Sequence, residues 1–164
     1  MIIRLAVHDD AVSMQEIHTA CTVTTMRAYY SEAQTAAWLD GRSPDGYLQA
    51  IAEGEQFLIA ENQSRVIGFS SWREQRICSL FVRPDDQGRG IGKSLLVACV
   101  TAISKRGADM VRVNASMNAV GFYESCGFIR VALADSVKHG VAIPYARMEG
   151  ALWRIRAVTR CVTG

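Results

Sequence analysis

The chain lacks the features that mark several large classes of protein. No stretch of its 164 residues approaches the roughly 18 consecutive apolar residues that a membrane-spanning helix needs. Its formal net charge is only +2, which gives no strong bias towards nucleic acid or an anionic membrane. Residues 1–10 carry Arg4, Asp9 and Asp10 and no long apolar run, so no secretion signal is evident. We therefore expect no nucleic-acid partner and no membrane partner.

Paired cysteine motifs are also absent. The five cysteines are Cys21, Cys78, Cys99, Cys126 and Cys161. Their number is odd, their spacing is wide and no C-x-x-C occurs, which disfavours both a disulfide framework and a zinc site. Such a set is typical of a reducing compartment, so we expect a cytoplasmic protein without a metal site.

The length corresponds to one ordinary domain, and 49% hydrophobic residues are enough for a sizeable core. We expect this domain over residues 1–149 and a basic tail over residues 150–164. The tail contains Arg154, Arg156 and Arg160 and no acidic residue. It could be a short helix or strand that docks on the domain, a frayed terminus, or a basic arm that binds a partner.

Hydrophobic periodicity and turn residues predict a mixed order of strands and helices without any repeat. Strands are expected over residues 2–7, 57–61, 66–72, 77–82, 110–113, 128–133 and 143–148. Helices are expected from residue 9 or 10 towards 30, and over residues 31–39, 45–53, 90–106 and 119–126. Ser31 and Gln34 fit a capping box, residues 40–46 fit a loop, and residues 62–64 fit the turn of a hairpin.

The most informative segment is residues 80–96, which predicts a strand, a tight turn and a glycine-rich start of a helix. It reads Leu80-Phe-Val-Arg-Pro-Asp-Asp-Gln-Gly-Arg-Gly-Ile-Gly-Lys-Ser-Leu-Leu96. Residues 87–93 would present several backbone N–H groups that lack a helical partner, and Arg89 and Lys93 add positive charge. This combination indicates a site for a pyrophosphate.

Spacing separates the phosphate-binding motifs that compete for this segment. A Walker loop needs a glycine where Gln87 stands, and a dinucleotide fingerprint needs its third glycine where Lys93 stands. Both are therefore excluded, and a P-loop kinase with them. The pattern that fits is [QR]-x-x-G-x-[GA], written here as Gln87-Gly-Arg-Gly90-Ile-Gly92.

A second block, residues 113–128, ends in Tyr123-Glu-Ser-Cys-Gly127-Phe128. With the glycine-rich block ahead of it, the chain from about Ile2 to Met148 resembles the GNAT superfamily of acetyl-CoA-dependent N-acetyltransferases. The resemblance implies an α+β fold, with a central, mainly antiparallel, twisted sheet flanked by helices. It also implies transfer of an acetyl group from acetyl-CoA to a primary amine of a small molecule or a peptide. Because many relatives are dimers, a homodimer is a further expectation.

The resemblance also assigns the cofactor site. It implies that the strand residues Leu80, Phe81 and Val82 pair through their backbone with the pantetheine arm, and that a main-chain N–H there polarises the thioester carbonyl. The pyrophosphate would be held by Gln87, Gly88, Arg89, Gly90, Ile91, Gly92 and Lys93. Ser116 stands where the family often has an asparagine that contacts pantetheine. Asn118 is either its substitute or a local cap of the helix that follows.

The resemblance makes Tyr123 the general acid that protonates the leaving thiolate; the other interpretation is a tyrosine that only donates a hydrogen bond to the sulfur. Some relatives use a glutamate as base near the position of Val111, which cannot act. Glu74, Glu32 and His139 remain as candidate bases. We expect the acceptor amine to lie near the aromatic residues Tyr29, Tyr30 and Trp72, with Trp38 in the core. A module that binds CoA without catalysis is the alternative, because Ser116 and the missing strand glutamate depart from the family pattern.

Overall fold

The computed structural model describes residues 1–160; residues 161–164, with Cys161 and the end of the expected tail, lie outside the described residues. One sheet contains the strands β1 (Ile2–Leu5), β2 (Gln56–Asn62), β3 (Arg65–Arg73), β4 (Arg76–Val82), β5 (Met110–Ser116), β6 (Ile129–Lys138) and β7 (Val141–Ala151). The helices are α1 (Asp10–Val23), α2 (Glu32–Leu39), α3 (Pro44–Ala52), α4 (Ile91–Ser104), α5 (Val120–Ser125) and α6 (Leu152–Arg160). None of the helices in this described part is long and apolar enough to cross a membrane.

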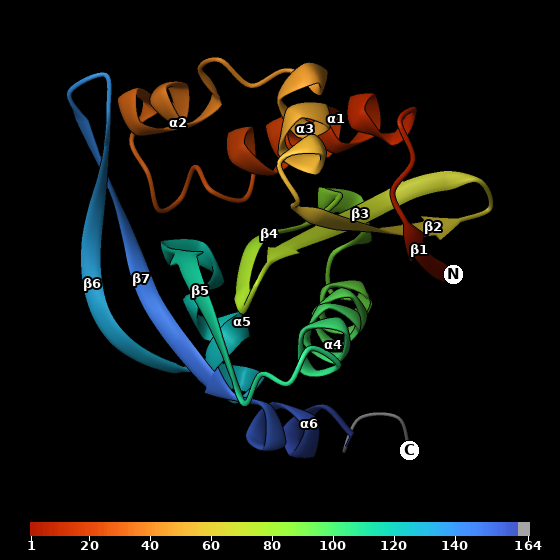
Figure 1. Ribbon diagram of the computed structural model, residues 1–164. Helices are drawn as coiled ribbons and strands as arrows, with labels where there is room; N and C mark the ends of the chain where they lie inside the picture. The colour runs from red at the N-terminus through yellow and green to blue at the C-terminus, as the bar shows by residue number, and fades with distance from the viewer. Residues whose placement is uncertain (161–164) are drawn as a thin grey trace.

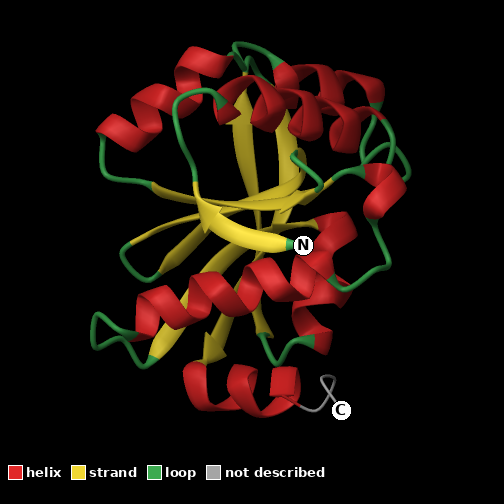
Figure 2. Cartoon of the chain, turned by 90° about the vertical axis from the view of Figure 1, so that its right-hand side faces the viewer, coloured by secondary structure: helices red, strands yellow, loops and turns green. Residues whose placement is uncertain are grey.

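Helices cover the sheet on both faces, as Figure 2 shows with α1–α3 above the strands and α4 below them. The reason is visible in β2, where alternate side chains enter different cores. Phe57 and Ile59 pack in the core under α1 and α3, and Leu58 and Ala60 pack in the core under α4. A strand that is apolar on both faces needs cover on both, which gives the layered α+β fold. The expected fold class is confirmed.

The sheet runs in the order β1-β2-β3-β4-β5-β7-β6, and every neighbouring pair is antiparallel except β4 and β5. The expected hairpin turn at residues 62–64 is present, with Gln63 and Ser64 at φ 49° and 61°. The final hairpin is longer than expected, since β6 and β7 continue to Lys138 and Val141. Its outer half alternates weakly in hydrophobicity because it projects beyond the core, as Figure 1 shows.

The first helix is shorter than expected. It ends at Val23 rather than near Tyr30, within the run Thr22-Val-Thr-Thr25. Such β-branched residues lose side-chain freedom in a helix. The hydroxyl groups of Thr24 and Thr25 also donate to the carbonyl groups of Ala20 and Cys21, at 2.6 and 2.8 Å. The end of α1 is thereby left facing the sheet.

The two following helices begin at side-chain caps. Ser31 and Gln34 form the expected capping box of α2. The loop is shorter than the expected residues 40–46, because α3 already begins at Pro44. Ser43 caps this helix by accepting a hydrogen bond from the N–H of Gly46.

The strands β4 and β5 separate soon after they meet. Their parallel pairing comprises only Arg76 with Arg112 and Ile77 with Val113. Next to this pair, the register between β3 and β4 shifts, so that Cys78 lies opposite no partner. The irregularity turns Ile77 into the core under α4, whereas Phe81 packs in the core under α1. Beyond it, the strands diverge and open a wedge in the middle of the sheet (Figure 1).

The expected basic tail continues the fold through residue 160. The boundary expected after residue 149 falls inside β7, and α6 follows directly. Leu152 and Ile155 are buried in the core that also contains α4, and Ile155 is 0% exposed. Gly150 leaves room for this contact, because a Cβ there would lie 2.7 Å from Ile155 Cδ1. Of the three interpretations of the tail, a docked helix describes residues 152–160.

The contact predicts that α6 stabilises the whole domain. Replacing Ile155 with alanine removes a fully buried side chain, so the free energy of unfolding should fall by about 2–4 kcal/mol. Urea denaturation followed by circular dichroism measures it. The matched control is Trp153→Ala on the same helix, where the side chain is 71% exposed and a change within about 0.5 kcal/mol is expected. If Ile155→Ala lowered the free energy of unfolding no more than Trp153→Ala, α6 would not be part of the cooperative folding unit.

Candidate active site

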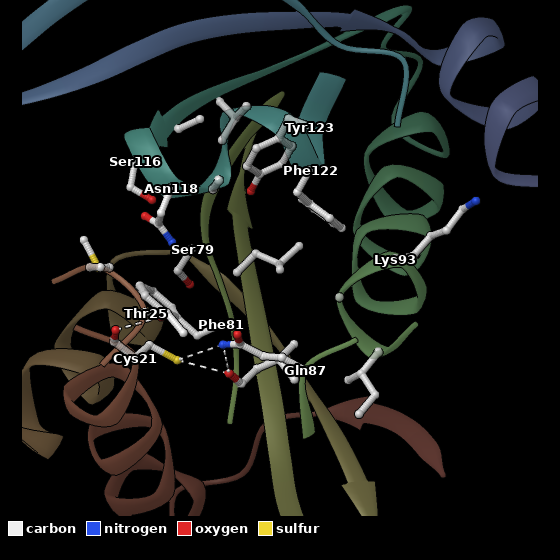
Figure 3. A pocket seen from close by; sticks show the side chains of 18 of the residues that line it. Cys21, Thr25, Ser79, Phe81, Gln87, Lys93, Ser116, Asn118, Phe122 and Tyr123 are labelled. Carbon is white, nitrogen blue, oxygen red and sulfur yellow. Dashed lines mark hydrogen bonds between the residues drawn. The ribbon is translucent and has the colours of Figure 1, made fainter. Parts of the chain in front are cut away.

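The wedge between β4 and β5 is the mouth of a cavity of about 470 Å³, which we call the central pocket. Figure 3 shows the side chains that line it. They come from the end of α1, from β4, from the turn before α4, from the end of β5 and from α5. Two segments expected to form one site, residues 80–93 and 116–123, therefore meet around one cavity.

The glycine-rich turn presents backbone donors to this cavity. Gly88 and Gly90 have φ values of 77° and 78°, a left-handed conformation that strains other residues. An added Cβ would meet nothing within 4 Å at either position, so the space outside the turn is open. Gly90 precedes α4 without any side-chain cap, which leaves the N–H groups of residues 91–93 without a helical partner. An anion such as a pyrophosphate fits this helix start.

The charged side chains of the turn contribute less to anion binding than the sequence indicates. Arg89 is 3.1 Å from Asp86, a buried carboxylate that also lies 3.6 Å from Arg65. Lys93 turns away from the cavity, and its Nζ lies 3.5 Å from the carbonyl oxygen of Val158 in α6 (Figure 3). Anion binding at the turn therefore depends mainly on backbone N–H groups.

The remaining turn residues have structural contacts. Gln87 donates from Nε2 to the carbonyl oxygen of Val82, at 3.0 Å, and so closes the end of β4. Ile91 is buried in the core, and Gly92 faces Phe122, with an ideal Cβ 3.5 Å from its ring. These residues shape the turn, and their side chains are not available to a phosphate.

The edge of β4 that faces the wedge is open. Leu80, Phe81 and Val82 line the central pocket, and no residue of β4 after Ile77 pairs with β5. Phe81 also stacks on His18 with ring centroids 4.2 Å apart. The carbonyl oxygen of Val82 already accepts from Cys21 Sγ and from Gln87 Nε2, each at 3.0 Å. Backbone groups in a sheet interior need partners, so the edge before this carbonyl group can accept an extended ligand with amide groups.

Tyr123 lies on α5 and reaches into the central pocket. Its ring is held edge-on between Phe122 and Phe128, with centroids 5.1 and 5.2 Å away. The side chain is 4% exposed, and its hydroxyl group points into the cavity without a hydrogen bond to any described residue (Figure 3). Burial raises the pKa of this phenol above its usual value, so the group carries its proton at neutral pH. It is therefore a donor directed at an empty space.

Asn118 has an unpartnered polar atom at the same cavity. Its Oδ1 is buried and accepts no hydrogen bond from the described residues. The N-cap of α5 is Ala119 and that helix has no side-chain cap, so a local capping role for Asn118 is not present. Ser116 lies beside it at the end of β5 (Figure 3). A ligand N–H that reached Oδ1 would remove the penalty of an unsatisfied buried acceptor.

The three aromatic residues expected at the acceptor site do not line the central pocket. Tyr29 is 57% exposed. Tyr30 is buried, and its hydroxyl group is fully used: it donates to the carbonyl oxygen of Pro144 and accepts from the N–H of Met117, each at 2.8 Å. Trp72 packs in the core under α4, because it alternates along β3 with Ser71, whose hydroxyl group contacts Ser79 on the opposite face.

Other pocket residues were missed in the sequence. Trp38, expected in the core, is only half-buried and lines the cavity. Cys21 lines it from the last turn of α1, and Thr25 lines it from just beyond the end of that helix, where its hydroxyl group donates to the carbonyl oxygen of Cys21. Phe122, beside Tyr123, also faces the cavity (Figure 3).

A second cavity of about 420 Å³, the side pocket, adjoins the first. The two share Trp38, Cys78, Ser79 and Phe81. The side pocket is further lined by His18, residues 40–43, Gly46, Tyr47, Ala50, Glu55, Phe57 and Lys138. Because these four residues border both cavities, the two pockets meet along a common wall.

His18 supports this common wall and does not titrate near neutrality. Its Nε2 accepts from Trp38 Nε1 at 2.9 Å, so Nδ1 carries the proton and donates to the hydroxyl group of Tyr47 at 2.7 Å. Burial, aided by the charges of Arg42 and Lys138, lowers the pKa of His18 to about 3. The residue is a neutral link between α1, α2 and α3.

The candidate bases lie away from the central pocket. Glu32 is exposed and pairs with Arg27, His139 is exposed and pairs with Asp40 at 2.7 Å, and Glu74 occupies an exposed turn. Val111, at the position of the glutamate in some relatives, is 0% exposed. Among the residues that line the central pocket, Asp86 is the one carboxylate, and it pairs with Arg89. Within residues 1–160, no three His, Cys, Asp or Glu side chains gather to hold a metal ion.

Known proteins share this fold and its motifs. The sequence model of the acetyltransferase (GNAT) domain family matches residues 26–150 of this chain. L-amino acid N-acyltransferase MnaT of Escherichia coli is 26% identical over 153 residues, which cover 84% of each chain. An uncharacterized N-acetyltransferase of Methanocaldococcus jannaschii is 26% identical over 134 residues, and these span 77% of this chain but only 59% of that longer protein.

Solved structures agree with the fold. A GCN5-related N-acetyltransferase from Rhodopseudomonas palustris superposes with a TM-score of 0.86 at 28% identity, over 92% of this chain and 94% of that one. YncA of Salmonella typhimurium, a putative acetyltransferase solved with its cofactor acetyl-CoA, has a TM-score of 0.65 at 24% identity, over 93% and 94% of the chains. The family match covers most of the chain, and the open edge of β4 and the uncapped start of α4 are consistent with it. The protein therefore belongs to the acetyltransferase (GNAT) family, as a member of its N-acetyltransferases.

Proposed function

We propose that the protein transfers an acetyl group from acetyl-CoA to a primary amine of a small molecule or a peptide, by direct attack of the amine, with Tyr123 as the general acid. One observation carries the proposal: the Tyr123 hydroxyl group is a buried donor without a protein partner, directed into a cavity bordered by the glycine-rich turn and the open edge of β4. Family membership supports acyl transfer in general, and Tyr123 supplies a specific role within it.

The chain offers a complementary surface for each part of the donor. The N–H groups at the start of α4 suit the pyrophosphate. The open edge of β4 suits the amide groups of the pantetheine arm, and Asn118 Oδ1 suits one of their N–H groups. When bound, acetyl-CoA supplies an activated acetyl group as a thioester. A main-chain N–H near Phe81 would polarise the carbonyl group of that thioester.

Tyr123 balances the charge on the leaving sulfur. As the N–C bond forms and the C–S bond breaks, its hydroxyl group gives a proton to the thiolate. A thiol has an ordinary pKa of about 8.5 and a phenol one of about 10, so the transfer is uphill in water. Burial raises the pKa of Tyr123, but a thiolate in the same cavity is equally desolvated. The shared environment limits the mismatch between the two groups.

The acceptor must lose a proton before it attacks, and the central pocket supplies no unpaired carboxylate for this step. A lysine-type amine, with a pKa near 10.4, is mostly charged at neutral pH, whereas an α-amine titrates near 7.7–8.0. An acceptor with a lower pKa needs less assistance, so this pocket favours α-amines over lysine side chains.

A CoA-binding module without catalysis is the alternative, and it is favoured by the valine at position 111 and by the paired state of Asp86. The two functions differ in one measurable property. The enzyme releases free CoA thiol in the presence of an amine, whereas the module binds CoA without turnover on any amine of a broad panel.

The acid role predicts the effect of Tyr123→Phe. Loss of the proton donor should lower kcat by about 100-fold, the lower end of the range for general acids, and should change CoA affinity less than about 2-fold. Thiol release measures kcat and calorimetry measures affinity. Tyr145→Phe, on a half-buried tyrosine of β7 that lines neither pocket, is the matched control. A decrease in kcat below about 10-fold would favour a tyrosine that only donates a hydrogen bond to sulfur.

The turn geometry predicts the effect of Gly90→Ala. The new side chain meets no atom within 4 Å but disfavours φ 78°, so the turn should shift and misalign its N–H groups. We expect CoA to bind about 10-fold more weakly in calorimetry, a loss of about 1.4 kcal/mol. Gly107→Ala places the same strain, at φ 82° and in open space, at the far end of α4. If both variants bound CoA equally well, the turn would not be the pyrophosphate site.

A further inference from the structure

The side pocket is lined by charges of both signs, which come from different elements. Arg42 and Lys138 line it from the loop between α2 and α3 and from the β6–β7 hairpin. Both cations are close enough to His18 to lower the pKa of that buried ring, so they approach the same wall of the cavity. Glu55 lines the cavity from the start of the sheet, beside Cys78.

The two cations have no carboxylate partner among the described residues. Arg42 donates only to the carbonyl oxygen of Trp38, at 3.4 Å, and no acidic group lies within ion-pair distance of it. The ammonium group of Lys138 donates to the carbonyl oxygen of Asp40, which leaves two of its N–H groups. The carboxylate of Asp40 is occupied by His139, at 2.7 Å. An anion placed here would therefore gain two charge-assisted contacts.

Glu55 is the acidic residue of this cavity whose partner is distant. Its side chain is 15% exposed, and its nearest cation, Arg73, is 3.9 Å away, at the limit of an ion pair. Burial raises the pKa of the Cys78 thiol, and the charge of Glu55 raises it further, which places the carboxylate beside the wall shared with the central pocket. Tyr47 lines the same cavity and is affected by both signs of charge: burial raises its pKa to about 12, Arg42 opposes that shift and Glu55 adds to it.

We propose that the side pocket is the acceptor site and that the acceptor is a primary amine that also carries a carboxylate. Its carboxylate binds Arg42 and Lys138, and its amine lies between Glu55 and the shared wall of Cys78 and Ser79. The proposal rests on the function proposed above, because the thioester must lie in the central pocket at Cys78 and Ser79, within reach of an amine at these same residues. The aromatic rings of Tyr47, Phe57 and Phe81 surround the carbon skeleton between the two charged groups.

The arrangement also completes the proton balance. The ammonium form of the acceptor gives one proton to Glu55, and the neutral amine attacks the thioester carbon. As the N–C bond forms and the C–S bond breaks, Tyr123 protonates the sulfur. The second proton lost by the nitrogen returns to Tyr123, and the proton on Glu55 passes to solvent. The products are an amide, a free thiol and one proton.

Matched pairs of acceptors test the proposal: each L-amino acid of a panel and its carboxamide, which keeps the amine and removes the negative charge. The primary measurement is binding by calorimetry to the protein saturated with CoA. We expect the amino acid to bind 10- to 100-fold more tightly than its carboxamide, and Arg42→Met to reduce that ratio about 10-fold. Lys138→Met should act in the same direction.

Arg27→Met is the matched control, since Arg27 is exposed, pairs with Glu32 and lines neither pocket. It should leave the ratio unchanged. Glu55→Gln should lower kcat for amino acids and move the acidic limb of the kcat/KM profile, with CoA affinity retained. A purely structural role of Glu55 would lower CoA affinity and unfolding free energy instead, which urea denaturation measures.

The outcomes separate this proposal from the function on which it rests. Equal binding of amino acids and carboxamides, or a ratio unchanged by Arg42→Met and Lys138→Met, would overturn the carboxylate site even if amines were acetylated. Selective binding of amino acids without any release of thiol would support the site and overturn the catalytic function. Selective binding with turnover supports both.

Discussion

The separation of β4 from β5 is the constraint on which the rest of the site depends. Two residue pairs hold the strands together, and the irregularity at Cys78 then turns the following residues of β4 towards α1. An open strand edge in the middle of a sheet is unfavourable unless another group pairs with it. The fold accepts it here because both flanking halves of the sheet are buried against helices. The same gap admits Tyr123 from one side and the glycine-rich turn from the other.

The site is assembled by elements that belong to different cores. The start of α4 and Tyr123 are fixed by the core that also contains Ile155 of α6. The side pocket is fixed by α1 and α3, through the hydrogen bonds of His18 with Trp38 and Tyr47. Phe81 stacks on His18 and lines both cavities. The relative position of the central pocket and the side pocket is therefore set by one strand, β4, which contributes to both cores.

The sequence predicted those structural features that depend only on residues close together in the chain. The capping box at Ser31, the turn at residues 62–64 and the strand–turn–helix unit around Gly90 depend on neighbours in the chain, and each is present. Side-chain direction was harder to predict. Tyr30 was assigned to the acceptor site by residue type, but its hydroxyl group is used by the backbone of distant segments. The charged end of the side pocket joins Arg42 to Lys138, 96 positions later, and no pattern along the chain records that meeting.

The position of the charges explains how a site with one weak acid can still operate near neutral pH. Tyr123 is deeply buried, so the phenol keeps its proton and adds no negative charge to the central pocket near neutral pH. His18 is neutral for the same reason, and it stacks on Phe81 without adding a charge of its own. Charged side chains without a close ion-pair partner among the described residues line the side pocket, where Glu55, Arg42 and Lys138 border the same cavity. A substrate with an ammonium group and a carboxylate would give a counter-ion both to Glu55 and to the two cations. A simple amine would leave Arg42 and Lys138 without a counter-ion.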